Sequence, residues 1–146
     1  MILIQTISFF VCFHFHAIFY TVILFYFSEP NVDLANNKIK DIKGLSMLSK
    51  LRKVDLGANR IRIIPQGISG GDEEEELPKS LEELWLGKNK IEMIQGLQNL
   101  TNLRRLDVQA NRLTTIEGLT SQVDTLEELY LSHNAVDNTG GMWCKS

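Results

Sequence analysis

The sequence predicts an α/β solenoid in which short parallel strands form a concave sheet and helical or 3₁₀ turns form the convex side. Two observations support this fold class. Five asparagines share one phase, because each comes three residues after an aliphatic residue and two residues before another. Their separations of 22, 30, 22 and 23 residues are nearly constant, as expected when each repeat forms one turn of a solenoid. These asparagines are Asn37, Asn59, Asn89, Asn111 and Asn134.

Each repeat begins with a predicted strand, at residues 32–34, 54–56, 84–86, 106–108 and 129–131. In these segments two aliphatic residues flank one other residue, so the alternation of a strand sends the aliphatics inward and the middle residue outward. The asparagine follows at a turn, where its amide both donates and accepts. A stacked column of asparagines therefore satisfies backbone groups that the turn leaves unpaired.

The second half of each repeat predicts the convex return. Residues 42–45, 94–97 and 116–119 read Ile-x-Gly-Leu, and glycine can adopt conformations that a side chain would forbid. The second repeat departs from this pattern at residues 64–68, which read Ile-Pro-Gln-Gly-Ile. The complete pattern, L-x-x-L-x-L-x-x-N-x-I-x-x-I-x-G-L, is typical of leucine-rich repeats.

The chain divides into three predicted parts: an apolar segment at 1–28, about five repeats at 29–142 and a tail at 143–146. Residues 1–27 contain no Asp, Glu, Lys or Arg and hold all seven phenylalanines. As a helix, this stretch would be ~40 Å long, enough to cross a hydrocarbon core of ~30 Å. Its interpretation stays open between a membrane anchor and non-coding DNA translated through a gene-model artefact, with a signal peptide as a third alternative. Because neither end of the array carries a polar cap, we expect a fragment of a longer solenoid.

Residues 69–78 form a predicted acidic loop within the single long interval between asparagines. It contains the run Asp72-Glu-Glu-Glu-Glu76, bracketed by Gly70, Gly71 and Pro78, which is typical of a solvated insertion. The formal net charge of −3 includes these five carboxylates, so the rest of the chain carries +2. No strong positive field remains to attract nucleic acid.

No combination of residues predicts catalysis, a cofactor or a metal site. Cys12 and Cys144 lie far apart in any solenoid, so neither a disulfide nor a metal site is predicted. His14 and His16 have no further ligands beside them. The motif Asn99-Leu-Thr101 matches a glycosylation sequon, but repeat packing also explains these residues.

The residues between the paired strand aliphatics form the candidate site. A solenoid displays them as one row on the concave sheet, where carboxylates and large aromatics suit the recognition of a folded protein partner. Aspartate has low strand propensity, which favours a functional explanation for its presence there. The row consists of Asp33, Asp55, Trp85, Asp107 and Tyr130.

A closer resemblance to one family rests on four segments, residues 56–62, 86–91, 109–119 and 129–134. They resemble consecutive middle repeats of the leucine-rich-repeat regulatory subunit of protein phosphatase 1, and the resemblance runs from Val32 to Val136. It implies a non-enzymatic nuclear or cytoplasmic scaffold that binds the phosphatase catalytic subunit on its concave face. By position, Asp55 corresponds to an acidic contact and Trp85 to an aromatic contact, whereas Asp33 stands where the family is aromatic. The alternatives are a membrane-anchored recognition protein and a non-functional truncated product.

Overall fold

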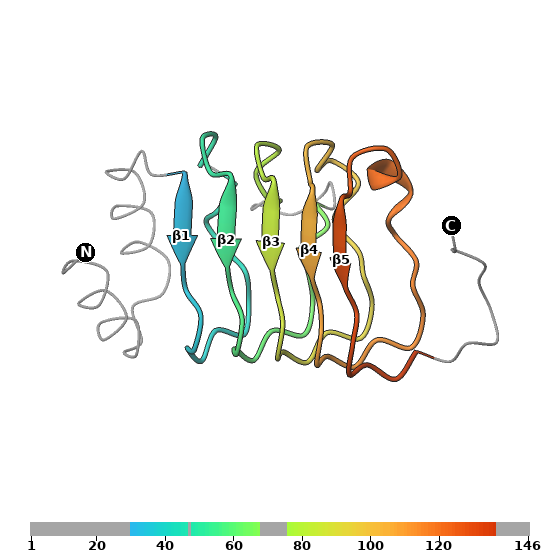
Figure 1. Cartoon of the computed structure of the whole chain (residues 1–146). Coiled ribbons are helices and arrows are strands. Elements are labelled where there is room, and N and C mark those ends of the chain that lie inside the picture. Colours follow the sequence, from blue (N-terminus) through green and yellow to red (C-terminus); the bar gives the residue numbers. More distant parts are fainter. Residues whose placement is uncertain (1–29, 47, 68–75, 137–146) are drawn as a thin grey trace.

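The computed structural model describes residues 30–46, 48–67 and 76–136, and the strands in these ranges form one parallel sheet (Figure 1). Its five strands lie in sequence order, so each repeat pairs only with its neighbours. This arrangement confirms the predicted parallel solenoid. Every strand begins and ends one residue earlier than expected. The strands are β1 (Asn31–Asp33), β2 (Lys53–Asp55), β3 (Glu83–Trp85), β4 (Arg105–Asp107) and β5 (Glu128–Tyr130).

The convex side contains less helix than predicted. Within the described ranges one 3₁₀ helix, η1 (Thr120–Gln122), is present, and the other repeats return through separate hydrogen-bonded turns. In two of these turns the N–H of Leu48 bonds the carbonyl of Leu45 at 3.0 Å, and that of Leu100 bonds Leu97 at 2.9 Å. In each of these repeats a second bond of the same kind follows three residues later, from Leu51 to Leu48 and from Leu103 to Leu100, so the bonds form separate turns and not a continuous helix.

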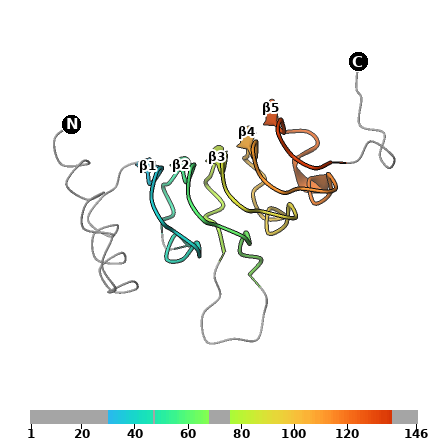
Figure 2. The same cartoon turned by 90° about the horizontal axis from the view of Figure 1, so that it is seen from below.

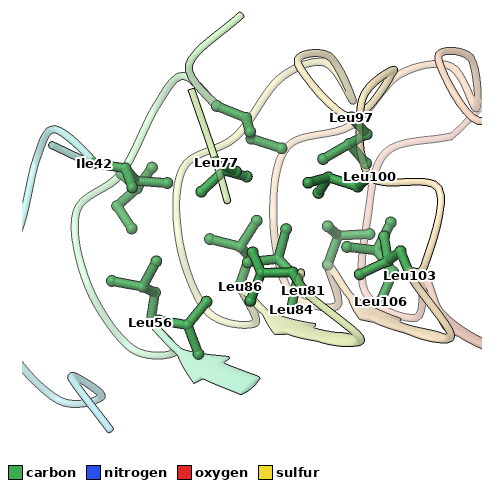
Figure 3. Packing of buried hydrophobic residues seen from close by; sticks show 14 of the residues in the cluster. Ile42, Leu56, Leu77, Leu81, Leu84, Leu86, Leu97, Leu100, Leu103 and Leu106 are labelled. Atoms are coloured by element: carbon green, nitrogen blue, oxygen red, sulfur yellow. The ribbon is translucent and has the colours of Figure 1, made fainter. Parts of the chain in front are cut away.

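Aliphatic side chains fill the space between the sheet and the convex turns (Figure 3). The central strand residues Val54, Leu84 and Leu106 are completely buried and stack one above another along the array. Each repeat therefore covers the apolar face of its neighbour, and stability depends on stacking rather than on any single repeat.

The asparagines form a hydrogen-bonded column along the solenoid. Asn59 shows the pattern: its Nδ2 donates to the carbonyls of Leu34 at 2.9 Å and Leu56 at 2.9 Å, and its Oδ1 accepts from the N–H of Ile39 at 3.0 Å. One amide thus joins two repeats. The residue before each asparagine takes a positive φ, between 51° and 59°. This left-handed turn is unusual for residues other than glycine.

Steric restrictions explain why glycine occurs at repeated positions on the convex side. Gly96 has a φ of +71° and Gly118 a φ of +77°, and a Cβ on either would collide with the carbonyl of Pro65 or Ile94 in the preceding repeat. Gly67, in the divergent second repeat, keeps the same left-handed conformation at +62°. Figure 2 shows these turns stacked opposite the curved row of strands.

Several sequence-based interpretations lie outside the described residues: the apolar segment 1–28, the tail 143–146 and the acidic loop except its last residues. Glu76 belongs to the described part, and its Oε1 accepts a hydrogen bond from Asn99 Nδ2 at 3.2 Å. Across the described ranges, no helix has the length and apolar character needed to span a bilayer. No group of potential metal ligands occurs in those same ranges.

Candidate functional site

The five residues of the concave row lie side by side on neighbouring strands. The sheet register pairs Asp33 with Asp55, Asp55 with Trp85, Trp85 with Asp107 and Asp107 with Tyr130. Neighbouring strands lie about 4.8 Å apart, so these side chains form one continuous surface. Their exposure differs, because Asp33 and Tyr130 are exposed, Asp55 and Trp85 are half-buried and Asp107 is only 6% exposed.

The aspartates have a local structural role that the sequence did not suggest. Each strand ends at its row residue, and Oδ1 of Asp33, Asp55 and Asp107 accepts the N–H two residues later, at 2.8 to 3.0 Å. Aspartate commonly stabilises turns in this way. This role explains why aspartate occurs at these positions despite its low strand propensity, and the explanation requires no binding partner. The second oxygen of Asp107 also accepts from Gln109 Nε2 at 3.2 Å, so Asp107 supports the surface rather than offering a free carboxylate.

Two aromatic rings form the most prominent feature of the row. Trp85 and Tyr130 stack with their centroids 5.9 Å apart and their planes 26° apart, although β4 lies between their strands. Asp107 occupies the position between them in the register. Such offset stacking is favourable by about 0.5–1.5 kcal/mol beyond the area that it buries.

Alternating charges run beside the aromatic pair, at the first residue of each strand from β2 to β5. Lys53 Nζ lies 3.3 Å from Glu83 Oε2, Arg105 lies 2.7 Å from Glu83 Oε1, and Arg105 Nε lies 2.9 Å from Glu128 Oε1. We call these four residues the charge ladder. It contacts both rings, because Trp85 Nε1 donates to Glu83 Oε2 at 3.1 Å and the Tyr130 hydroxyl donates to Glu128 Oε2 at 2.6 Å.

The ladder shifts the pKa values of its members in the directions expected for ion pairs. Partial burial alone would raise the pKa of Glu83, but hydrogen bonds from Trp85, Arg105 and Lys53 outweigh it and hold that pKa below 4.5. Hydrogen bonds from Tyr130 and Arg105 lower the pKa of Glu128. The Tyr130 pKa is raised because its hydroxyl donates to the Glu128 carboxylate. Both carboxylates are thus ionised near neutral pH.

Comparison with known families assigns these repeats. The family described as Leucine Rich repeats matches residues 79–121 as a two-copy unit, and a single Leucine Rich repeat matches residues 125–142. Both matches coincide with the parallel turns that contain β3, β4 and β5. The chain therefore contains leucine-rich repeats.

Several different proteins are similar to this chain in sequence. The chain is 36% identical over 113 residues to the protein phosphatase 1 regulatory inhibitor subunit PPP1R7 homolog of Arabidopsis thaliana, covering 76% of this chain and 32% of that protein. It is 31% identical over 121 residues to leucine-rich repeat-containing protein 23 of Bos taurus, covering 73% of this chain and 35% of that protein. The chain thus spans about a third of the length of these relatives.

A solved leucine-rich-repeat structure supports the fold alone. An internalin from Listeria monocytogenes superposes with a TM-score of 0.57 at 23% sequence identity, covering 77% of this chain and 37% of that chain. Both proteins share the parallel-strand solenoid.

The charge ladder is the part of this leucine-rich-repeat surface that the sequence analysis missed. A signal was present, because from the second strand to the fifth the two residues before the central aliphatic residue alternate in charge from repeat to repeat. They are Arg52 and Lys53, then Glu82 and Glu83, then Arg104 and Arg105, then Glu127 and Glu128. The first residue of each pair forms an outer row of more exposed pairs: Arg52 lies 3.5 Å from Glu82, and Arg104 lies 3.2 Å from Glu127.

Proposed function

We propose that the repeats bind the catalytic subunit of protein phosphatase 1 on the concave face and thereby act as a non-enzymatic regulatory scaffold. The stacked pair of Trp85 and Tyr130 carries this proposal, because it presents aromatic surface on a rigid sheet. The similarity to the phosphatase regulatory inhibitor subunit homologue supports the choice of partner. The same resemblance supports a nuclear or cytoplasmic location.

The proposed contacts combine an aromatic anchor with acidic neighbours. Trp85 and Tyr130 would bury their rings against the partner, and large aromatics are frequent among residues that dominate binding energy. Asp33 and Asp55 lie at the other end of the row, and within the described ranges only Oδ1 of each carboxylate accepts a turn N–H. Their Oδ2 atoms suit pairing with lysine or arginine side chains, which improves specificity and the rate of association. Asp107 contributes by supporting its neighbours.

A titration with the purified phosphatase catalytic subunit tests the proposal. We expect Trp85→Ala to weaken binding by ~2 kcal/mol or more, as for a desolvated anchor, and Asp55→Ala to weaken it less because its carboxylate stays partly hydrated. Met93→Ala is the matched control, because Met93 is a large apolar residue that is 58% exposed outside the concave row. Equal affinities for the wild type, Trp85→Ala and Asp55→Ala would exclude the concave row as the binding site.

A further inference from the structure

We propose that the charge ladder positions the two rings before any partner arrives, with Arg105 as its central positioning residue. This inference rests on the proposed function for its effect on binding, but its effect on the rings is independent of the partner. The charge ladder is the set Lys53, Glu83, Arg105 and Glu128.

Trp85 is held by three different contacts. Its indole Nε1 donates to Glu83 at 3.1 Å, the Lys53 ammonium lies 5.2 Å from its ring centroid, and Tyr130 stacks on it. A cation near a tryptophan ring is attracted to the negative face of that ring. The hydrogen bond, the cation and the stacked ring together restrict the indole to one orientation.

Each glutamate of the ladder divides its two oxygens in the same way. Oε1 of Glu83 and Oε1 of Glu128 both bind Arg105, at 2.7 Å and 2.9 Å. Oε2 of Glu83 accepts from Trp85, and Oε2 of Glu128 accepts from Tyr130. One guanidinium therefore fixes both acceptors, and through them both rings. Its planar fork of donors suits this task, whereas a lysine ammonium would act as a single point of charge.

Pre-orientation affects binding through conformational entropy. Immobilising a side chain at an interface reduces affinity by about two- to tenfold, and this loss is avoided when the side chain is already fixed. Ion pairs that keep part of their surface in water, as these half-buried pairs do, contribute little to folding stability. We therefore expect the ladder to influence the rings and the affinity more than it influences unfolding.

The outer row provides a matched control within the same repeat, because Arg104 directly precedes Arg105 and β4. Arg104 pairs with Glu127 at 3.2 Å, and in the described part of the chain it contacts neither ring. Arg104→Gln and Arg105→Gln remove neighbouring arginines: Arg104→Gln breaks one exposed ion pair, and Arg105→Gln breaks the two half-buried pairs with Glu83 and Glu128. For these measurements Trp143→Phe is introduced into the full chain of the reference protein and of every variant, so that Trp85 is the sole tryptophan.

The first measurement needs no partner. Arg105→Gln should alter the near-ultraviolet circular dichroism of the rings and make Trp85 fluorescence easier to quench with acrylamide, whereas Arg104→Gln should leave both signals unchanged. Unaltered signals in Arg105→Gln, or equal changes in both variants, would overturn the positioning role.

The second measurement is affinity for the phosphatase catalytic subunit. We expect Arg105→Gln to bind about two- to tenfold more weakly and Arg104→Gln to bind as the wild type does. Arg105→Lys separates positioning from direct charge contact, because it keeps the charge and loses the fork. Arg105→Lys should resemble Arg105→Gln in both measurements. If Arg105→Lys instead shows the spectra and the affinity of the wild type, the inference is overturned. If the wild type itself does not bind, the proposed function fails, and the spectra alone decide the positioning role.

Discussion

Replacing Asn89 with alanine should destabilise the solenoid by about 2–4 kcal/mol, mainly because one buried backbone N–H loses its hydrogen-bond acceptor. Asn89 is 8% exposed, and its Oδ1 accepts the N–H of Ile61 at 3.0 Å. Alanine leaves that buried N–H without this partner, a loss of about 1–3 kcal/mol. Nδ2 also donates to the carbonyls of Leu56 and Leu86, both at 3.0 Å. These carbonyls accept from a neighbouring asparagine as well, so each loss there is smaller.

Asn37→Ala is the control for this prediction. Asn37 Nδ2 donates to two carbonyls of its own turn, but no backbone N–H donates to its Oδ1 among the described residues. Alanine should therefore cost only about 1 kcal/mol. Urea unfolding of the full chain, followed by far-ultraviolet circular dichroism and extrapolated linearly to water, gives both free energies. Equal losses for Asn37→Ala and Asn89→Ala would refute the reasoning from the orphaned N–H.

Two further predictions concern pH and backbone conformation. The pKa values of Glu83 and Glu128 lie below 4.5, so their stabilising contribution is complete above that pH and is lost as the pH falls through the lower folded values. The small difference between the urea midpoints of the wild type and Glu83→Gln should therefore be present at about pH 6 and shrink as the pH falls below 4.5; a constant difference would count against the ladder. Gly96→Ala should destabilise by at least about 2 kcal/mol more than Gly44→Ala, because both sites are left-handed but only Gly96 faces a carbonyl that Cβ would strike. Similar melting temperatures for the two variants would contradict this.

The fold was predictable because each repeat supplies the same local signals. The phase of Asn59 and Asn89 located the turns, and the alternation of Leu84 and Leu86 located a strand to within one residue. The convex turns were harder, because the same i to i+3 bond can stand alone, as at Leu45, or extend into the short helix at Thr120–Gln122. Sequence periodicity does not distinguish these outcomes over so few residues.

The site was predictable in position but not in detail. The alternation of a strand placed Trp85 and Tyr130 in one row, yet their stacking across an intervening strand depends on side-chain rotamers. Asp107 looked equivalent to Asp55, but the structure buries it and engages both of its oxygens. Propensity describes the strand interior, whereas Asp107 ends its strand and stabilises the turn that follows.

Hydroxyl-radical footprinting of the chain, alone and mixed with the phosphatase catalytic subunit, tests concave binding most directly. Radicals oxidise tryptophan, tyrosine and methionine side chains that solvent reaches, and this protein places such residues both within and outside the concave row. Trp85 and Tyr130 lie in the row, whereas Met93 is 58% exposed outside it. We predict slower oxidation of Trp85 and Tyr130 in the mixture and an unchanged rate for Met93. Protection of Met93 with unchanged rates at Trp85 and Tyr130 would contradict binding on the concave face.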